Sequence, residues 1–205
     1  MKFINRAAAS NALQQFTPRI VPRILINRYH PAQSLSKDSI NLWKVYLDKI
    51  GMAKGGREVL AKLTNEACEF YLNQLRYSHH EILKAALGAL KELITKVEGS
   101  AETIRNHFEE IMVACFKVTR HENPPIRSLC FITLGSLISK CPEQAKPKLP
   151  QFIDVGFFQI CFNFKSEEIA ESVAVYLVEI YKTFKDVKRT YWRISNFSIG
   201  GASYL

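Results

Sequence analysis

The chain has 205 residues, of which 47% are apolar and 23% are charged, so it suits a single folded unit and not a fibrous or disordered protein. The formal charge is +9, but the excess of Lys and Arg lies at the two ends, within residues 1–37 and 182–193. Because the middle is near neutral, the sequence argues against a basic face for nucleic acid along the whole chain.

The cysteines indicate a reducing compartment. Their number is odd, no CxxC motif occurs, and most of them fall within apolar helical runs, where a cysteine acts as a small hydrophobic residue. No apolar run approaches the ~18 residues that span a membrane. We therefore predict a cytoplasmic protein. The alternative is a mitochondrial one, because the segment before Asp38 contains Arg and Ser but no acid, as in a transit peptide. The cysteines are Cys68, Cys115, Cys130, Cys141 and Cys161.

The spacing of apolar residues predicts helices and no strand. Glycine- or proline-containing breaks separate these helices, such as the Gly55-Gly56 and Pro124-Pro125 pairs. The prolines suit the first turn of a helix, where their missing N–H groups cost little. In chain order, the predicted helices run over residues 12–29, 35–50, 57–76, 79–97, 101–120, 124–140, 148–164 and 167–185.

Four segments repeat along the chain at intervals of about 43–47 residues, which is the period of HEAT and armadillo units. Each segment carries apolar or small residues at its first position and at the fourth, eighth and eleventh residues after it. These positions lie within about 80° on a helix, so each segment predicts one apolar stripe. The segments begin at Leu35, Ile82, Ile126 and Ile169, and the residues eight positions further on are Trp43, Leu90, Leu134 and Leu177.

This pattern resembles the HEAT-repeat family, with armadillo repeats as close relatives. The resemblance covers roughly residues 12–185 and is strongest over residues 123–127, where a polar turn residue and an aliphatic residue precede Arg127. The other three units have Ser36, Leu83 and Ala170 in place of that arginine. The resemblance implies an all-α fold, a right-handed α-solenoid of about four stacked helical hairpins. In such a fold the second helix of each hairpin lines the concave face.

The same frame divides the chain into a basic N-terminal segment, a repeat array and a C-terminal tail. Four hairpins are a short array, so we expect a longer solenoid or a larger complex, with a tail that caps the last hairpin as the alternative. The segment covers residues 1–11, the array 12–185 and the tail 186–205, and the hairpins of the array cover residues 12–50, 57–97, 101–140 and 148–185.

Exposed residues of the second helices are expected two and nine positions after each segment start. The first two repeats place lysines there, which predicts a cationic cluster at one end of the concave face, able to bind an acidic protein. The alternative is an ordinary solvated helix face. The third and fourth repeats place Ser128, Gly135, Glu171 and Val178 there. The candidate partner-binding residues are Lys37, Lys44, Lys84 and Lys91.

Other lysines have a structural explanation. Lys49, Lys96 and Lys140 share one position near the ends of the second helices, where a cation complements the helix dipole.

The sequence contains no motif for catalysis, a metal or a cofactor. His79 and His80 are adjacent and so point in different directions on a helix, and the Gly55-Gly56 pair lacks a phosphate-binding pattern. We therefore expect a non-catalytic scaffold for protein–protein interaction, as the resemblance also implies. The alternative is a nucleic-acid-associated repeat protein that uses its basic ends.

Overall fold

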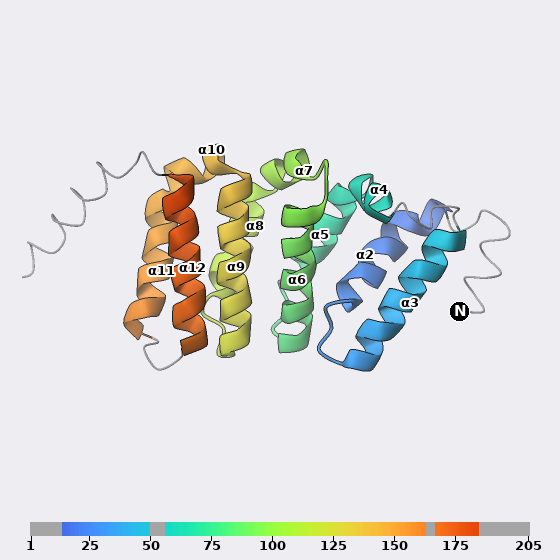
Figure 1. Cartoon of the computed structure of the whole chain (residues 1–205), viewed down its shortest axis with the longest axis horizontal. Coiled ribbons are helices and arrows are strands. Elements are labelled where there is room, and N and C mark those ends of the chain that lie inside the picture. Colours follow the sequence, from blue (N-terminus) through green and yellow to red (C-terminus); the bar gives the residue numbers. More distant parts are fainter. Residues whose placement is uncertain (1–13, 50–55, 163–166, 185–205) are drawn as a thin grey trace, which may run out of the picture.

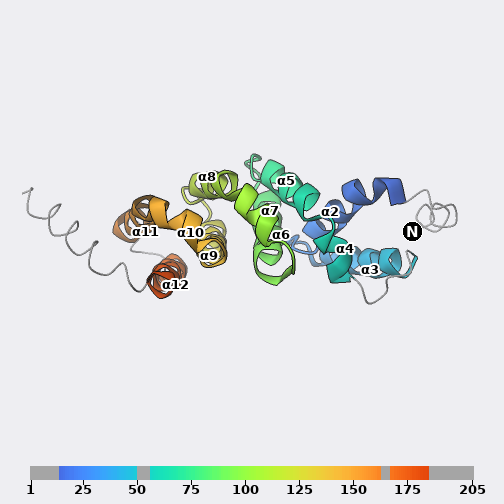
Figure 2. The same ribbon diagram turned by 90° about the horizontal axis from the view of Figure 1, so that it is seen from above.

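The computed structural model describes residues 14–49, 56–162 and 167–184, and all regular structure within these ranges is helical (Figure 1). The all-α fold predicted from the apolar spacing is therefore confirmed for this part of the chain. The helices pack as consecutive antiparallel pairs: α2 on α3, α5 on α6, α8 on α9 and α11 on α12. Seen from above, the first helices of the pairs form one row and the second helices form another (Figure 2).

The second helices match the predicted segments closely. They are α3 (Gln33–Lys49), α6 (His80–Lys96), α9 (Pro124–Lys140) and α12 (Glu167–Thr183). Pro124 opens α9 as predicted, after Asn123 at the cap position. Lys96 and Lys140 lie in the last turns of α6 and α9, as expected for cations that complement the helix dipole. The side chain of Lys49 lies outside the described residues.

The first helices differ from the prediction, because most are interrupted. A short helix precedes each of the last three, and at His107 the backbone (φ −97°, ψ 10°) leaves the helical region between α7 and α8. This break turns α7 across the start of α5, where the hydroxyls of Thr64 and Thr103 lie 2.8 Å apart. The first helices with their leading elements are η1 (Gln14–Phe16) and α2 (Thr17–Asn27), α4 (Gly56–Ala61) and α5 (Thr64–Gln74), α7 (Ala101–Asn106) and α8 (Phe108–Val118), and α10 (Pro142–Ala145), η2 (Lys146–Lys148) and α11 (Leu149–Phe162).

The predicted apolar stripes form the core between the two rows. Leu90 and Leu134 are fully buried, and Trp43 and Leu177 are half-buried against the same core. Leu35 is different, with 42% of its surface exposed. It lies in the first turn of α3, which within the described ranges packs broadly on α2 alone.

The row of second helices is not evenly packed, because it is interrupted between α3 and α6. Broad contacts join α6 to α9 and α9 to α12, but among the described residues no comparable contact joins α3 to α6. In Figure 1, α3 diverges from α6 instead of lying alongside it. The end of α2 and the turn after it contact α6 in place of α3. The first hairpin is therefore attached to the second mainly through α2.

Candidate functional site

The exposure of equivalent residues on the second helices depends on how closely the next second helix packs on them. On α9, Ser128 and Gly135 face α12, and both are buried there, contrary to their expected exposure. The hydroxyl oxygens of Ser128 and Ser172 lie 2.5 Å apart. On α12 the equivalent residues, Glu171 and Val178, are exposed as expected. Small residues on α9 therefore let α12 approach closely.

On α6 the equivalent positions carry Lys84 and Lys91, and the contact with α9 is less extensive than that between α9 and α12. A lysine side chain at this position keeps its charged end in water and holds the neighbouring helix at a distance. The two lysines line a cavity of about 220 Å³ between α6 and α9. Its other lining residues are Tyr29, Gly88, Glu92, Thr95, Lys96 and Leu129.

A second cavity, of about 390 Å³, continues from the first toward α12. The two adjoin at Thr95, and we call the surface that they line across α6, α9 and α12 the second-helix groove. Its floor is made of apolar and small side chains, and its charges are unevenly placed. The second cavity is lined by Ile94, Thr95, Ile132, Gly135, Ser136, Ser139, Lys140, Val175 and Glu179.

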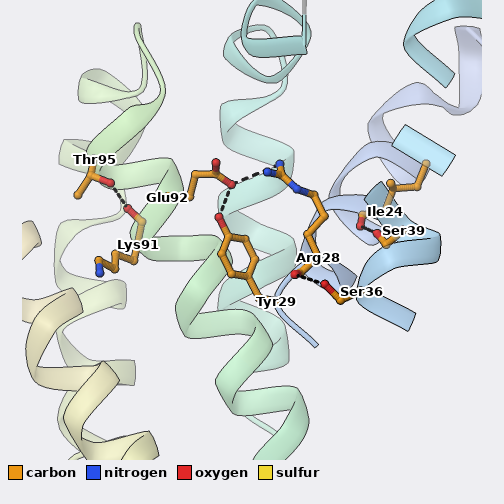
Figure 3. A network of polar contacts seen from close by, with 8 residues as sticks. All are labelled: Ile24, Arg28, Tyr29, Ser36, Ser39, Lys91, Glu92 and Thr95. Carbon is orange, nitrogen blue, oxygen red and sulfur yellow. Dashed lines mark hydrogen bonds and ion pairs between the residues drawn. The ribbon is translucent and has the colours of Figure 1, made fainter. Parts of the chain in front are cut away.

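The turn after α2 lies against α6 at one end of this groove, where Tyr29 is part of the lining (Figure 3). The hydroxyl of Tyr29 donates a hydrogen bond of 2.5 Å to Glu92 Oε2, and Arg28 Nη1 lies 3.5 Å from the same oxygen. Burial first, and then the bond to Glu92, raise the pKa of Tyr29. The phenol therefore stays protonated and remains a donor.

The Tyr29 ring is held against α6 by the absence of a side chain on Gly88. A Cβ atom on Gly88 would lie 2.7 Å from Tyr29 Cδ1 and 2.8 Å from Cγ, closer than carbon atoms approach. The small residue at position 88 thus admits the ring. Nothing in the apolar spacing of the sequence indicated this contact, because the polar bond that fixes the ring, from Tyr29 to Glu92, joins residues 63 positions apart.

The four lysines predicted as a cluster are divided between two places. Lys84 and Lys91 line the same cavity. Lys37 and Lys44 are exposed on α3, which diverges from α6, and they do not line the second-helix groove. The cations that join Lys84 and Lys91 there are instead Lys96 and Lys140. From the sequence we expected only a structural role for these two, at the helix ends.

A larger cavity, of about 720 Å³, lies on the other face of the molecule, between α5 and α8. Its charged lining residues have both signs, among them Glu109 and Glu110 on one hand and Arg76 and Lys117 on the other. These charges nearly balance, so the lining favours no particular charge in a ligand. The second-helix groove also carries both signs, but it has four lysines and two glutamates, one of which, Glu92, is bonded to Tyr29. It is therefore the better candidate for a charged partner.

The buried cysteines and tyrosines of the core have raised pKa values, which favours a packing role over a chemical one. Burial raises the pKa of Cys68 to about 12, and burial also raises the pKa values of Cys130, Tyr71 and Tyr176. These groups stay protonated near neutral pH and are poor nucleophiles. Within the described ranges, no group of three or more His, Cys, Asp or Glu side chains is arranged to hold a metal ion.

No helix in the described ranges combines the length and apolarity needed to span a membrane. No protein-family model, curated protein or solved structure matches the chain.

Proposed function

We propose that the chain is a non-catalytic scaffold for protein–protein interaction, built as a right-handed α-solenoid of HEAT- or armadillo-like hairpins. The observation that carries this proposal is the second-helix groove, which runs over three consecutive hairpins. A groove shared by several rigid elements offers a long, preformed surface to an extended or helical partner segment. Because its walls are helices packed on a common core, binding requires little ordering of the scaffold.

The chemistry of the groove supports binding over catalysis. Its lining combines apolar and hydroxyl-bearing side chains with charged ones, a mixture typical of partner-binding surfaces. A hydrolytic or transferase site needs a nucleophile and a base within bonding distance of each other. The ionisable groups that line the groove are lysines, two glutamates and a tyrosine whose hydroxyl is bonded to Glu92.

The proposal is tested by blocking the floor of the groove. Ser136 is half-buried there on α9, and Ser136→Trp would fill the space between α9 and its neighbours. We expect affinity capture from a cell lysate to recover partner proteins with the wild type and to lose them with Ser136→Trp. The matched control is Gln151→Trp, an exposed position on α11 in the other row.

If both tryptophan variants capture the same proteins as the wild type, the groove is not the binding surface. If the captured material is nucleic acid that is released steeply with salt, the alternative function of a nucleic-acid-associated repeat protein replaces the scaffold. Helical circular dichroism of each variant shows whether the fold is retained.

A further inference from the structure

The α6 helix carries lysines and glutamates at spacings that normally pair within one helix. Glu81 and Lys84 are three residues apart, and Glu92 and Lys96 are four residues apart, in the favourable order with the acid first. Neither ion pair forms in the structure, although all four side chains lie in the described part of the chain. The recorded partners of the two glutamates are residues outside α6.

Residues of the turn after α2 face both carboxylates, and two of them bind Glu92. Tyr29 and Arg28 bind Glu92, as Figure 3 shows. His30 Nε2 lies 3.8 Å from Glu81 Oε2. Because His30 Nδ1 accepts a hydrogen bond from the backbone N–H of Ala32, the imidazole proton is on Nε2 and faces the glutamate.

The consequence is a row of cations with no carboxylate partner. Among the described residues, Lys84, Lys91, Lys96 and Lys140 form no ion pair, and all four line the second-helix groove. Glu92, the only acid in the cavity that three of them share, is already bonded to Tyr29 and Arg28. Toward α12 the groove carries Glu179, so its cationic half is the part between α6 and α9.

We propose that this half of the groove binds an extended acidic segment of a partner protein, and that Arg28 and Tyr29 keep it receptive by holding the Glu92 carboxylate away from the lysines. This inference rests on the scaffold function proposed above. Lys84 and Lys91 are seven residues apart, so they lie on nearly the same side of α6 and are separated by roughly 10 Å at 1.5 Å per residue. An extended chain advances about 3.4 Å per residue, so two acids about three residues apart in the partner would match them.

The floor of the groove favours a peptide over a nucleic acid. Leu129 and Ile132 are half-buried on α9 and can receive an apolar side chain that lies between the acidic ones. Binding of single-stranded nucleic acid depends on aromatic rings on which bases stack. The aromatic ring in the lining, that of Tyr29, lies against Gly88 and is occupied by that contact.

The test uses the whole chain and a fluorescently labelled twelve-residue peptide in which glutamates alternate with valines and leucines. A second peptide has glutamine in place of every glutamate. By fluorescence anisotropy at low salt, we expect the glutamate peptide to bind and the glutamine peptide to bind at least about tenfold more weakly. Lys84→Gln with Lys91→Gln should weaken binding of the glutamate peptide about tenfold, whereas Lys37→Gln with Lys44→Gln should leave it unchanged.

The role of the turn is tested separately with Tyr29→Phe. This variant keeps the ring against Gly88 but removes the hydroxyl that binds Glu92. Only Arg28 then holds the carboxylate, which can reach Lys96 more often. We expect a two- to threefold loss of affinity for the glutamate peptide, and Tyr29→Phe with Glu92→Gln should restore it. A structural role of Tyr29 alone would not produce this rescue.

Equal binding of the two peptides, or equal losses from the groove pair and the α3 pair of lysine variants, would overturn the acidic-segment assignment. Tighter binding of a single-stranded oligonucleotide of matched charge would replace the peptide with a nucleic acid. If the glutamate peptide fails but Ser136→Trp still abolishes partner capture, the scaffold function stands and only the charge assignment fails.

Discussion

Replacement of Gly88 by alanine gives the sharpest test of the contact between the first hairpin and the second. In an open helix interior, Gly→Ala stabilises by about 1 kcal/mol through backbone entropy. Here the new Cβ would lie 2.7 Å from Tyr29 Cδ1, 2.8 Å from Cγ and 3.1 Å from Cβ. These atoms are near the root of the tyrosine side chain, so a small rotation cannot relieve the overlap.

The expected result follows from the opposing free energies. Overpacking costs about 1–3 kcal/mol, and displacement of Tyr29 also weakens, without abolishing, its bond to the Glu92 carboxylate. Against the helix-propensity gain, we expect Gly88→Ala to lower the free energy of unfolding by about 1–2 kcal/mol. In a chain of this size, the midpoint of thermal unfolding should fall by roughly 2–8 °C.

A double-mutant cycle measured by chemical denaturation checks this reasoning. In the Tyr29→Ala background the obstacle is gone, so Gly88→Ala should there stabilise by about 1 kcal/mol. Gly135→Ala is the matched control, because its Cβ would meet its nearest neighbour, Glu179 Cβ, at an ordinary 3.7 Å. It should stabilise the wild type by about 0.5–1 kcal/mol. If Gly88→Ala stabilises the wild type as much as Gly135→Ala does, Tyr29 does not pack on α6 as described.

Three further predictions concern the packing and the core. Ser128→Lys places a lysine where α12 approaches α9 and should lower the free energy of unfolding by at least about 2 kcal/mol. Lys84→Ser on α6 should change the free energy of unfolding by less than about 0.5 kcal/mol. Denaturant titrations that show equal effects would contradict the different packing of the α6–α9 and α9–α12 contacts. Burial raises the pKa of Tyr71 above the ordinary value of 10.0, so near and above that pH the folded state binds more protons than the unfolded state. The free energy of unfolding should therefore fall as pH rises from about 9 to 11, and Tyr71→Phe should reduce this slope. An unchanged slope would show that the phenol ionises equally in both states. Burial raises the pKa of Cys68 to about 12 and also raises that of Cys130. In a Cys161→Ser variant, neither of these two thiols should react with a thiol reagent at pH 8 until denaturant is added. Mass spectrometry that finds Cys68 or Cys130 modified in the native protein would refute the described burial.

The sequence by itself determined the helices and their order. Apolar residues at helical spacing, broken by glycine and proline, predicted the second helices to within a few residues, and the stripe residues Leu90 and Leu134 are buried as expected. These features depend on local periodicity and on short connections, both of which are readable along the chain. Pairing of consecutive helices follows because neighbours in sequence are joined by short turns.

Only the tertiary structure decided which neighbouring hairpins pack closely together and which diverge. The divergence of α3, the breaks in the first helices and the contact of Tyr29 with Gly88 all depend on residues far apart in sequence. Repeat positions that look equivalent in sequence then differ in exposure, so Lys84 lines a groove while Ser128 is buried. Apolar periodicity fixes which side of a helix is buried, but the distance between helices depends on the size and charge of the particular side chains that meet.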